Sequence, residues 1–218
     1  MTLAPRRTRV KMCGTTRMED ALAAVRFGVD ALGFIFSAKS PRYIAPEKAA
    51  SILSNLPPFI DRVGVFVDAS LAEIVRTAGF GLSYIQLHGN ESPDYCRQLQ
   101  EMLPFCGLIK AFRVGGESCC DTFTPYAPCV DAFLLDTYVR GTSGGTGLVF
   151  DWSIIENLKL QRPIILAGGL SPENVACAIA AVHPYAVDIN SAIEHKPGIK
   201  DHLRLQALMQ VVAEIARR

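Results

Sequence analysis

The sequence carries almost no excess charge of either sign. Its 218 residues include 22 Lys and Arg against 21 Asp and Glu, which gives a formal net charge of +1. Nucleic-acid-binding domains are usually strongly basic, so we expect no nucleic-acid partner. Arg6, Arg7 and Arg9 are too few to form a basic stripe, and we interpret residues 1–8 as a solvated N-terminal tail.

Long hydrophobic runs are also missing. No uninterrupted apolar stretch approaches the roughly 18 residues that a transmembrane helix needs. The first residues, MTLAPRRTR, lack the apolar core of a signal peptide. We therefore expect no membrane partner and a cytoplasmic location.

Paired cysteines are absent as well. The seven cysteines are an odd number and none forms a C-x-x-C pair, so we expect no disulfide framework in a chain of this length. The four histidines are not spaced as ligands beside paired cysteines. The sequence therefore predicts no metal site, and we expect most of the thiols to be inert core side chains.

Short apolar runs alternate with amphipathic stretches along the chain. The predicted strands cover residues 9–13, 30–36, 62–68, 84–89, 107–114, 131–137, 162–169 and 186–191. The predicted helices cover residues 18–28, 46–56, 70–80, 92–103, 152–158, 171–182 and 201–218, and the segment from 115 through Pro128 is poorly defined. Apolar strands that alternate with helices indicate a parallel sheet covered by helices.

Eight such repeats predict an α/β protein of the (β/α)8 TIM-barrel class, with one domain over residues 1–218. A doubly wound open sheet is the alternative, but it usually has fewer strands, and no G-x-G-x-x-G follows the first predicted strand. In a barrel the active site lies at the carboxyl ends of the strands. The residues that the sequence places there are Cys13, Arg42, His88, Asp136, Gly168, Gly169, Asn190 and Ser191.

Three features of the loops that follow the strands allow both a chemical and a structural interpretation. The glycines of LAGGLSPENV, Gly168 and Gly169, would let backbone N–H groups and a helix end approach a phosphate, or they serve a tight turn. Arg42 could hold a carboxylate in a bidentate pair, or it is solvated like most loop arginines. The four-glycine loop 140–152, which contains Gly145, is a substrate-shaping lid or an ordinary connection.

Cys13 and Asp136 are the candidates for proton transfer. Asp136 ends a very apolar strand, and burial would raise its pKa and let it act as an acid, although it could instead brace the next loop. Only the thiolate of Cys13 is a base, so its pKa of ~8.5 must be lowered or matched by nearby charge. Lys11 lies two residues earlier on the same strand and could help. A single cysteine is otherwise more often inert core.

Taken together, the motifs resemble those of the phosphoribosylanthranilate isomerase family. The matching stretches include KMCGTT (11–16), IQLHGNE (85–91), LLDTYVRGTSGGTGLVFDW (134–152), LAGGLSPENV (166–175) and VDINSAIEHKPGIKD (187–201), in order along nearly the whole chain. This resemblance implies the Amadori rearrangement of a phosphorylated aminosugar in tryptophan biosynthesis. It also implies a TIM barrel that needs no cofactor and works as a monomer or homodimer.

The resemblance also assigns roles to the residues. Asp136 matches the general acid and Cys13 the general base, and Arg42 matches the residue that contacts the anthranilate carboxylate. Gly168, Gly169, Asn190 and Ser191 fall on the phosphate-binding loops, and His88 and Gly145 are assigned to substrate binding.

One stretch departs from the family pattern. Asn190 stands where a serine is common, and Ala192 where a glycine is common. If that glycine needs a positive φ, Ala192 would strain the loop.

Two other functions remain as alternatives. The related histidine-pathway isomerase is expected to use two aspartates, whereas the first strand here carries Cys13. A non-catalytic barrel would bind a phosphorylated ligand without turnover.

Overall fold

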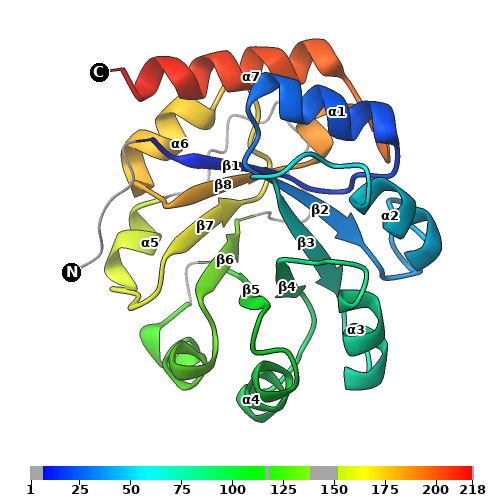
Figure 1. Cartoon of the computed structure of the whole chain (residues 1–218). Helices are drawn as coiled ribbons and strands as arrows, with labels where there is room; N and C mark the ends of the chain where they lie inside the picture. Colours follow the sequence, from blue (N-terminus) through cyan, green and yellow to red (C-terminus); the bar gives the residue numbers. More distant parts are fainter. Residues whose placement is uncertain (1–6, 116–117, 138–151, 218) are drawn as a thin grey trace.

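Eight parallel strands close into a barrel in the order of the sequence (Figure 1). The structure, a computed structural model, describes residues 7–115, 118–137 and 152–217. The barrel strands are β1 (Arg9–Met12), β2 (Ala31–Ile35), β3 (Asp61–Phe66), β4 (Tyr84–Leu87), β5 (Gly107–Arg113), β6 (Ala132–Asp136), β7 (Ile164–Ala167) and β8 (Ala186–Ile189). The predicted (β/α)8 fold is confirmed.

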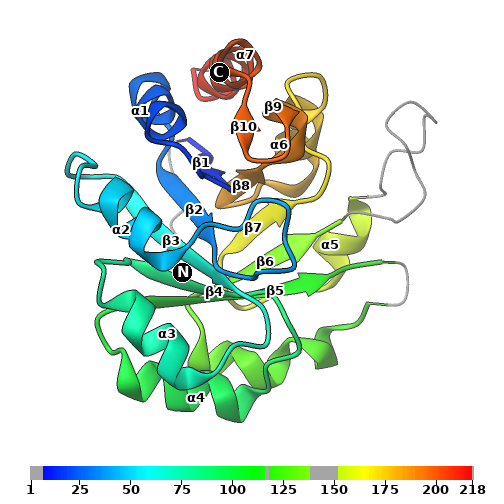
Figure 2. The same cartoon turned by 90° about the vertical axis from the view of Figure 1, so that its right-hand side faces the viewer.

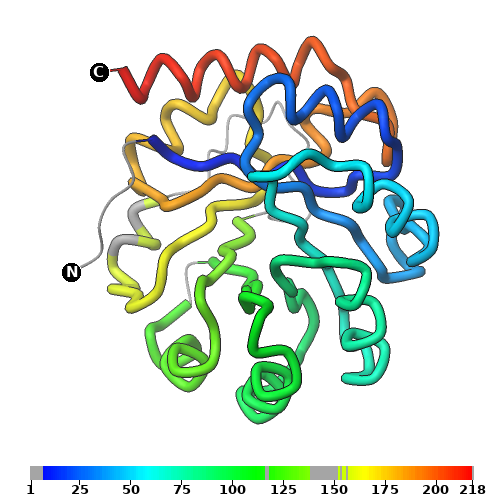
Figure 3. The backbone as a smooth tube through the Cα atoms, in the orientation of Figure 1, coloured from blue at the N-terminus to red at the C-terminus, as the bar shows by residue number. Residues whose placement is uncertain are grey.

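Helices surround the barrel, as Figures 1 and 2 show from two directions. They are α1 (Met18–Phe27), α2 (Pro46–Leu53), α3 (Leu71–Ala78), α4 (Pro93–Met102), α5 (Ser153–Asn157), α6 (Val175–Val182) and α7 (His202–Ile215). The last helix lies beside the first and completes the ring (Figure 3). None of the helices in the described part of the chain is long and apolar enough to cross a bilayer.

Side-chain caps fix several helix starts where the sequence predicts them. The Ser70 hydroxyl accepts a hydrogen bond from the Glu73 backbone N–H, and Ser92 caps α4 in the same way. At the other end of α1, Gly28 adopts φ +84°, a left-handed conformation that suits glycine. These local signals fix where the helices begin and end.

The structure corrects the predicted start of α6. The helix begins at Val175, with Asn174 as its N-cap, and not near Ser171. The Asn174 side-chain oxygen accepts a hydrogen bond from the Ser171 N–H, which stabilises a turn in place of the first helical residues.

The structure also has elements that the sequence reading did not identify. Between β5 and β6 lie two 3₁₀ helices, η1 (Cys120–Thr122) and η2 (Thr124–Cys129), and η2 contains Pro125 and Pro128, whose nitrogens cannot donate a backbone hydrogen bond. A third 3₁₀ helix, η3 (Ser191–Ile193), follows β8. A hairpin then joins β9 (Glu194–Lys196) to β10 (Ile199–Lys200) through Pro197 and Gly198. The Pro-Gly pair is a turn signal, and Gly198 has φ +80°.

The N-terminal arginines are not simply solvated. The Arg7 guanidinium forms two hydrogen bonds with the Asp30 carboxylate, at 2.8 and 2.7 Å. Arg9 is the first residue of β1 and lies over the Tyr185 ring. Arg7 therefore stays exposed to solvent while it pairs with Asp30, and Arg6 lies outside the described residues.

Alternation along each strand decides which side chains point into the barrel. One core cluster combines small and branched residues of several strands, including Ala132, Leu134 and Ala186. Successive residues of a strand face opposite sides. The next positions on the same faces are Asp136 after Leu134, and Asp188 after Ala186. Asp136 and Asp188 therefore lie on the same face of their strands as these inner apolar residues.

A buried ion pair fixes the carboxyl end of β4. Lys110 Nζ lies 3.1 Å from Glu91 Oε2, and both side chains are 2% exposed. Lys110 also donates to the carbonyl of Gly89, and Glu91 accepts hydrogen bonds from the N–H groups of Asp68 and Gly89. These contacts shape the loop that follows His88.

Replacing Lys110 by methionine is expected to lower the free energy of unfolding by about 3–5 kcal/mol, because it leaves a buried carboxylate unpaired. Urea unfolding followed by circular dichroism measures the change. Lys48→Met, at an exposed position, is the control. Equal stability of the two variants would contradict the importance of the pair.

Candidate active site

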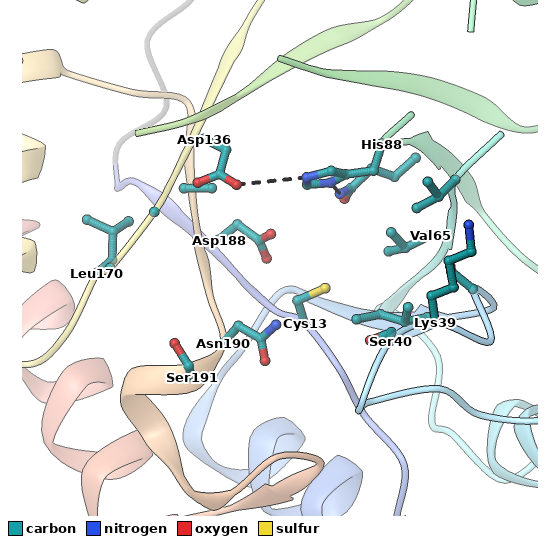
Figure 4. A pocket seen from close by; sticks show the side chains of 17 residues that line it. Cys13, Lys39, Ser40, Val65, His88, Asp136, Leu170, Asp188, Asn190 and Ser191 are labelled. Atoms are coloured by element: carbon teal, nitrogen blue, oxygen red, sulfur yellow. Dashed lines mark hydrogen bonds and ion pairs between the residues drawn. The ribbon is translucent and has the colours of Figure 1, made fainter. Parts of the chain in front are cut away.

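A cavity of about 440 Å³ opens at the carboxyl ends of the strands. Its volume is typical of a small-molecule site. Seven residues that the sequence assigned to the site line it, namely Cys13, His88, Asp136, Gly168, Gly169, Asn190 and Ser191. They come from five different strand ends, which the barrel brings together (Figure 4).

Cys13 follows β1 directly, and its N–H donates to the Ile189 carbonyl on β8. The residue is 5% exposed, yet it lines the cavity, and Figure 4 shows its sulfur directed into the open space. Burial raises the pKa of the thiol above its ordinary value. The positive charges of Lys11 and Lys200 oppose this rise in the pKa, and the Asp188 carboxylate adds to it.

Asp136 lies across the cavity from Cys13, at the end of β6. Its Oδ2 atom is 3.8 Å from Nε2 of His88. The side-chain nitrogen of Gln86 lies 3.0 Å from Nδ1 of the same ring. An amide N–H can only donate, so Nδ1 is the acceptor and Nε2 carries the proton that faces Asp136. Gln86, which the sequence reading missed, thus orients the imidazole.

Thr137 joins the Asp136 strand end to the glycine loop. Its hydroxyl lies 2.9 Å from the Ala167 carbonyl and 3.4 Å from that of Gly168. The side chain is buried, so these contacts hold the ends of β6 and β7 at a fixed separation. Asp136 and Gly168 are therefore held at a fixed separation on the cavity wall.

The two glycines after β7 have positive φ, +99° at Gly168 and +62° at Gly169. A side chain is rarely tolerated in this conformation. Both residues also line the cavity. The sequence allowed two interpretations of this glycine pair, a tight turn or a loop that approaches a ligand. The positive φ values fit the turn, and the place of both glycines on the cavity wall fits the ligand loop.

Ala192, in the loop after β8, does not need a glycine conformation. The described non-glycine residues with positive φ are Phe59, Asp68, Lys159 and His183, and Ala192 is not among them. The Ala192 carbonyl accepts a hydrogen bond from Arg204 at 2.6 Å. The concern that Ala192 needs a glycine conformation is therefore removed.

Arg42 is not part of the cavity wall. Its Nε and Nη2 atoms donate to the Glu194 carboxylate at 2.7–3.0 Å. Burial raises the pKa of Glu194, but hydrogen bonds from Arg42 and Lys200 outweigh burial and hold this pKa below its ordinary value. From the same loop, Lys39 and Ser40 line the cavity instead. The predicted contact of Arg42 with a carboxylate ligand stays a prediction.

Lys200 connects several parts of the site. Its Nζ atom donates to the Cys13 carbonyl at 2.6 Å, to Glu194 Oε1 at 2.8 Å and to Asn190 Oδ1 at 3.0 Å. The last contact orients the Asn190 amide. Lys200 belongs to the hairpin, which the sequence reading missed, although the Pro-Gly signal was present.

Two predicted features cannot be placed. Gly145 and residues 140–151 of the glycine loop lie outside the described residues. Within the part of the chain that is described, no group of three or more His, Cys, Asp or Glu side chains could hold a metal ion.

Residues 10–211 match the family model described as N-(5'-phosphoribosyl)anthranilate (PRA) isomerase. The chain belongs to this isomerase family. The N-(5'-phosphoribosyl)anthranilate isomerase of Citrifermentans bemidjiense is 49% identical over 210 residues, which cover 96% of this chain and 98% of the relative.

Solved structures of phosphoribosylanthranilate isomerases agree with this assignment. The Thermotoga maritima structure has a TM-score of 0.85 and 42% identity, and the match covers 95% of this chain and 99% of that one. A second structure, in complex with reduced 1-(o-carboxyphenylamino)-1-deoxyribulose 5-phosphate, has a TM-score of 0.82 and 39% identity, with the same coverage. The Thermotoga maritima isomerase is described as dimeric and has also been solved as monomers generated from the dimer.

Proposed function

We propose that this protein isomerises N-(5'-phosphoribosyl)anthranilate to 1-(o-carboxyphenylamino)-1-deoxyribulose 5-phosphate in tryptophan biosynthesis. The observation that carries the proposal is one cavity with Cys13 and Asp136 on different sides and a glycine pair on its wall. Membership of the isomerase family supports it. The substrate partner is a small phosphorylated aminosugar. Cytoplasmic location and the choice between monomer and homodimer stay predictions.

Ring opening is the first step of the proposed mechanism. Asp136 donates a proton to the furanose ring oxygen, the bond from that oxygen to C1 breaks, and the nitrogen lone pair forms a protonated Schiff base. His88, with its Nε2 proton toward Asp136, can stabilise the carboxylate that remains.

Proton removal from the sugar is the second step. The Cys13 thiolate takes the proton from C2, and the electrons of that bond form the C1–C2 double bond while the iminium nitrogen is neutralised. The resulting enolamine gains a proton at C1 and loses its C2 hydroxyl proton to give the ketone. An iminium group acidifies the neighbouring C–H bond, so a thiolate is a sufficient base.

Binding of the two anionic ends is assigned to opposite loops. Gly168, Gly169, Asn190 and Ser191 lie on the loops after β7 and β8, which often hold phosphate in this fold. Their place on the same cavity wall supports this assignment. The carboxylate of the anthranilate would lie near the loop that contains Arg42.

Growth complementation tests the function. The gene should restore growth without tryptophan to a strain that lacks this isomerase, and the purified protein should convert freshly prepared substrate. A parallel assay with the histidine-pathway substrate distinguishes that isomerase. Binding of the substrate without turnover would favour the non-catalytic barrel.

Arg42→Ala is expected to raise KM by roughly 10- to 100-fold with a smaller change in kcat, because a hydrogen bond to a charged group contributes about 1.5–3 kcal/mol. Steady-state kinetics measures both constants. Lys39→Ala is the matched variant, since Lys39 lines the cavity from the same loop. An unchanged KM for Arg42→Ala with a raised KM for Lys39→Ala would transfer the carboxylate contact to Lys39.

A further inference from the structure

Lys11 is a buried ammonium group beside the active-site sulfur. It is 3% exposed, and its Nζ atom lies 2.8 Å from Oδ1 of Asp188. The strand register explains the contact, because Lys11 on β1 pairs with Asp188 on β8. Removing both charges from water is costly, and such pairs often contribute little to stability. The pair therefore calls for a functional explanation.

The bare backbone of Gly33 lets Lys11 and Cys13 approach each other. A methyl group added to Gly33 would lie 2.9 Å from the Cys13 sulfur and 3.1 Å from Lys11 Nζ. The sulfur and the ammonium are thus no more than about 6 Å apart, a distance at which an opposite charge favours the ionised form. Burial alone would lower the pKa of Lys11, but Asp188 and Cys13 raise it above its ordinary value, so Lys11 stays charged.

The other charged groups around Cys13 are placed differently. Lys200 directs its Nζ atom to the Cys13 carbonyl and to Glu194, which partly neutralises it. Asp136 and His88 lie across the cavity, as Figure 4 shows. The Asp188 carboxylate lines the cavity and is the negative charge nearest to Lys11.

We propose that Lys11 is a positioning residue that sustains the Cys13 thiolate by placing a positive charge beside the sulfur, with Asp188 holding and moderating that charge. The inference rests on the proposed role of Cys13 as base. The proposal requires that Lys11 and Asp188 have opposite effects on formation of the Cys13 thiolate. Loss of Lys11 makes the thiolate harder to form, and loss of the Asp188 charge makes it easier.

Alkylation of Cys13 tests this without any assay of turnover. The full-length protein is treated with iodoacetamide across a range of pH, and mass spectrometry of the Cys13 peptide separates it from the other six cysteines. In Lys11→Met the midpoint of alkylation should move upward by roughly 1–3 pH units. In Asp188→Asn it should move downward. Lys11→Arg should remain near the parent protein, and Lys48→Met is the surface control.

Each outcome of the alkylation experiment either supports or overturns the inference. Opposite shifts support the inference, and an unchanged midpoint in Lys11→Met overturns it. Shifts of the same sign in both variants also overturn it, because loss of packing alone would produce them. If Lys11→Met does not fold, Asp188→Asn decides, and anything but a downward shift overturns the inference.

The pH profile of kcat separates this inference from the proposed function. In Lys11→Met the limb of the profile that rises with pH, as the Cys13 thiolate forms, should move upward with the alkylation midpoint. If Cys13→Ala turns over normally, the proposed base is wrong, whatever the alkylation result. If Cys13→Ala is inactive but Lys11→Met keeps the parent profile, only the role of Lys11 is wrong.

Discussion

Replacing Cys13 by alanine is expected to lower kcat by about 10²–10⁴-fold, because one positioned proton transfer contributes that much to the rate. The methyl group fits the space of the thiol, so the cavity and the loops proposed to bind phosphate should remain. The reduced ribulose phosphate analogue should therefore bind with nearly unchanged affinity. Steady-state kinetics and titration calorimetry measure the two quantities.

Two control variants sharpen this test. Cys13→Ser keeps the size of the group but replaces a thiol by a much weaker acid, so it should be as inactive as Cys13→Ala. Cys177→Ala removes an exposed thiol of α6 and should retain full activity. Turnover near the parent rate in either Cys13 variant would reject the base assignment.

Asp136→Asn should have an effect of similar size on kcat, again about 10²–10⁴-fold. The amide has nearly the same shape as the carboxyl group, but it cannot supply a proton to the ring oxygen. Because ring opening comes first in the proposed mechanism, the variant should accumulate bound, unreacted substrate. Rapid-quench analysis of a single turnover measures that accumulation.

The control for Asp136 is Asp121→Asn, which changes an exposed carboxylate in η1. It should leave kcat unaltered. An Asp136→Asn protein that binds the product analogue and turns over at the parent rate would show that another group opens the ring.

Much of the barrel follows from local patterns in the sequence. The two-residue period of the strands and the serine caps at Ser70 and Ser92 depend on a few neighbouring residues, so the sequence alone predicts them. The same period explains why Asp136 reaches the cavity face. The start of α6 was misread because Ser171 and Asn174 carry competing capping signals, and only the folded loop decides between them.

The parts of the site that the sequence did not reveal depend on distant contacts. The Arg42 guanidinium is engaged by Glu194, far along the chain, and no local pattern announces that pairing. Asp188 meets Lys11 only because β8 lies next to β1 in the closed ring. Such contacts are consequences of topology, so the chemical character of Cys13 emerges only from the assembled barrel.

The contacts of Lys200 also have a consequence for biosynthesis of the protein. This residue bonds to the Cys13 carbonyl near the start of the chain and to Asn190 near its end. Cys13 is synthesised 187 residues before Lys200, so a nascent chain gains these bonds only after residue 200 has left the ribosome. The contact that holds the Cys13 backbone therefore forms only as the ring closes, and a chain cut short before the hairpin carries the thiol without it.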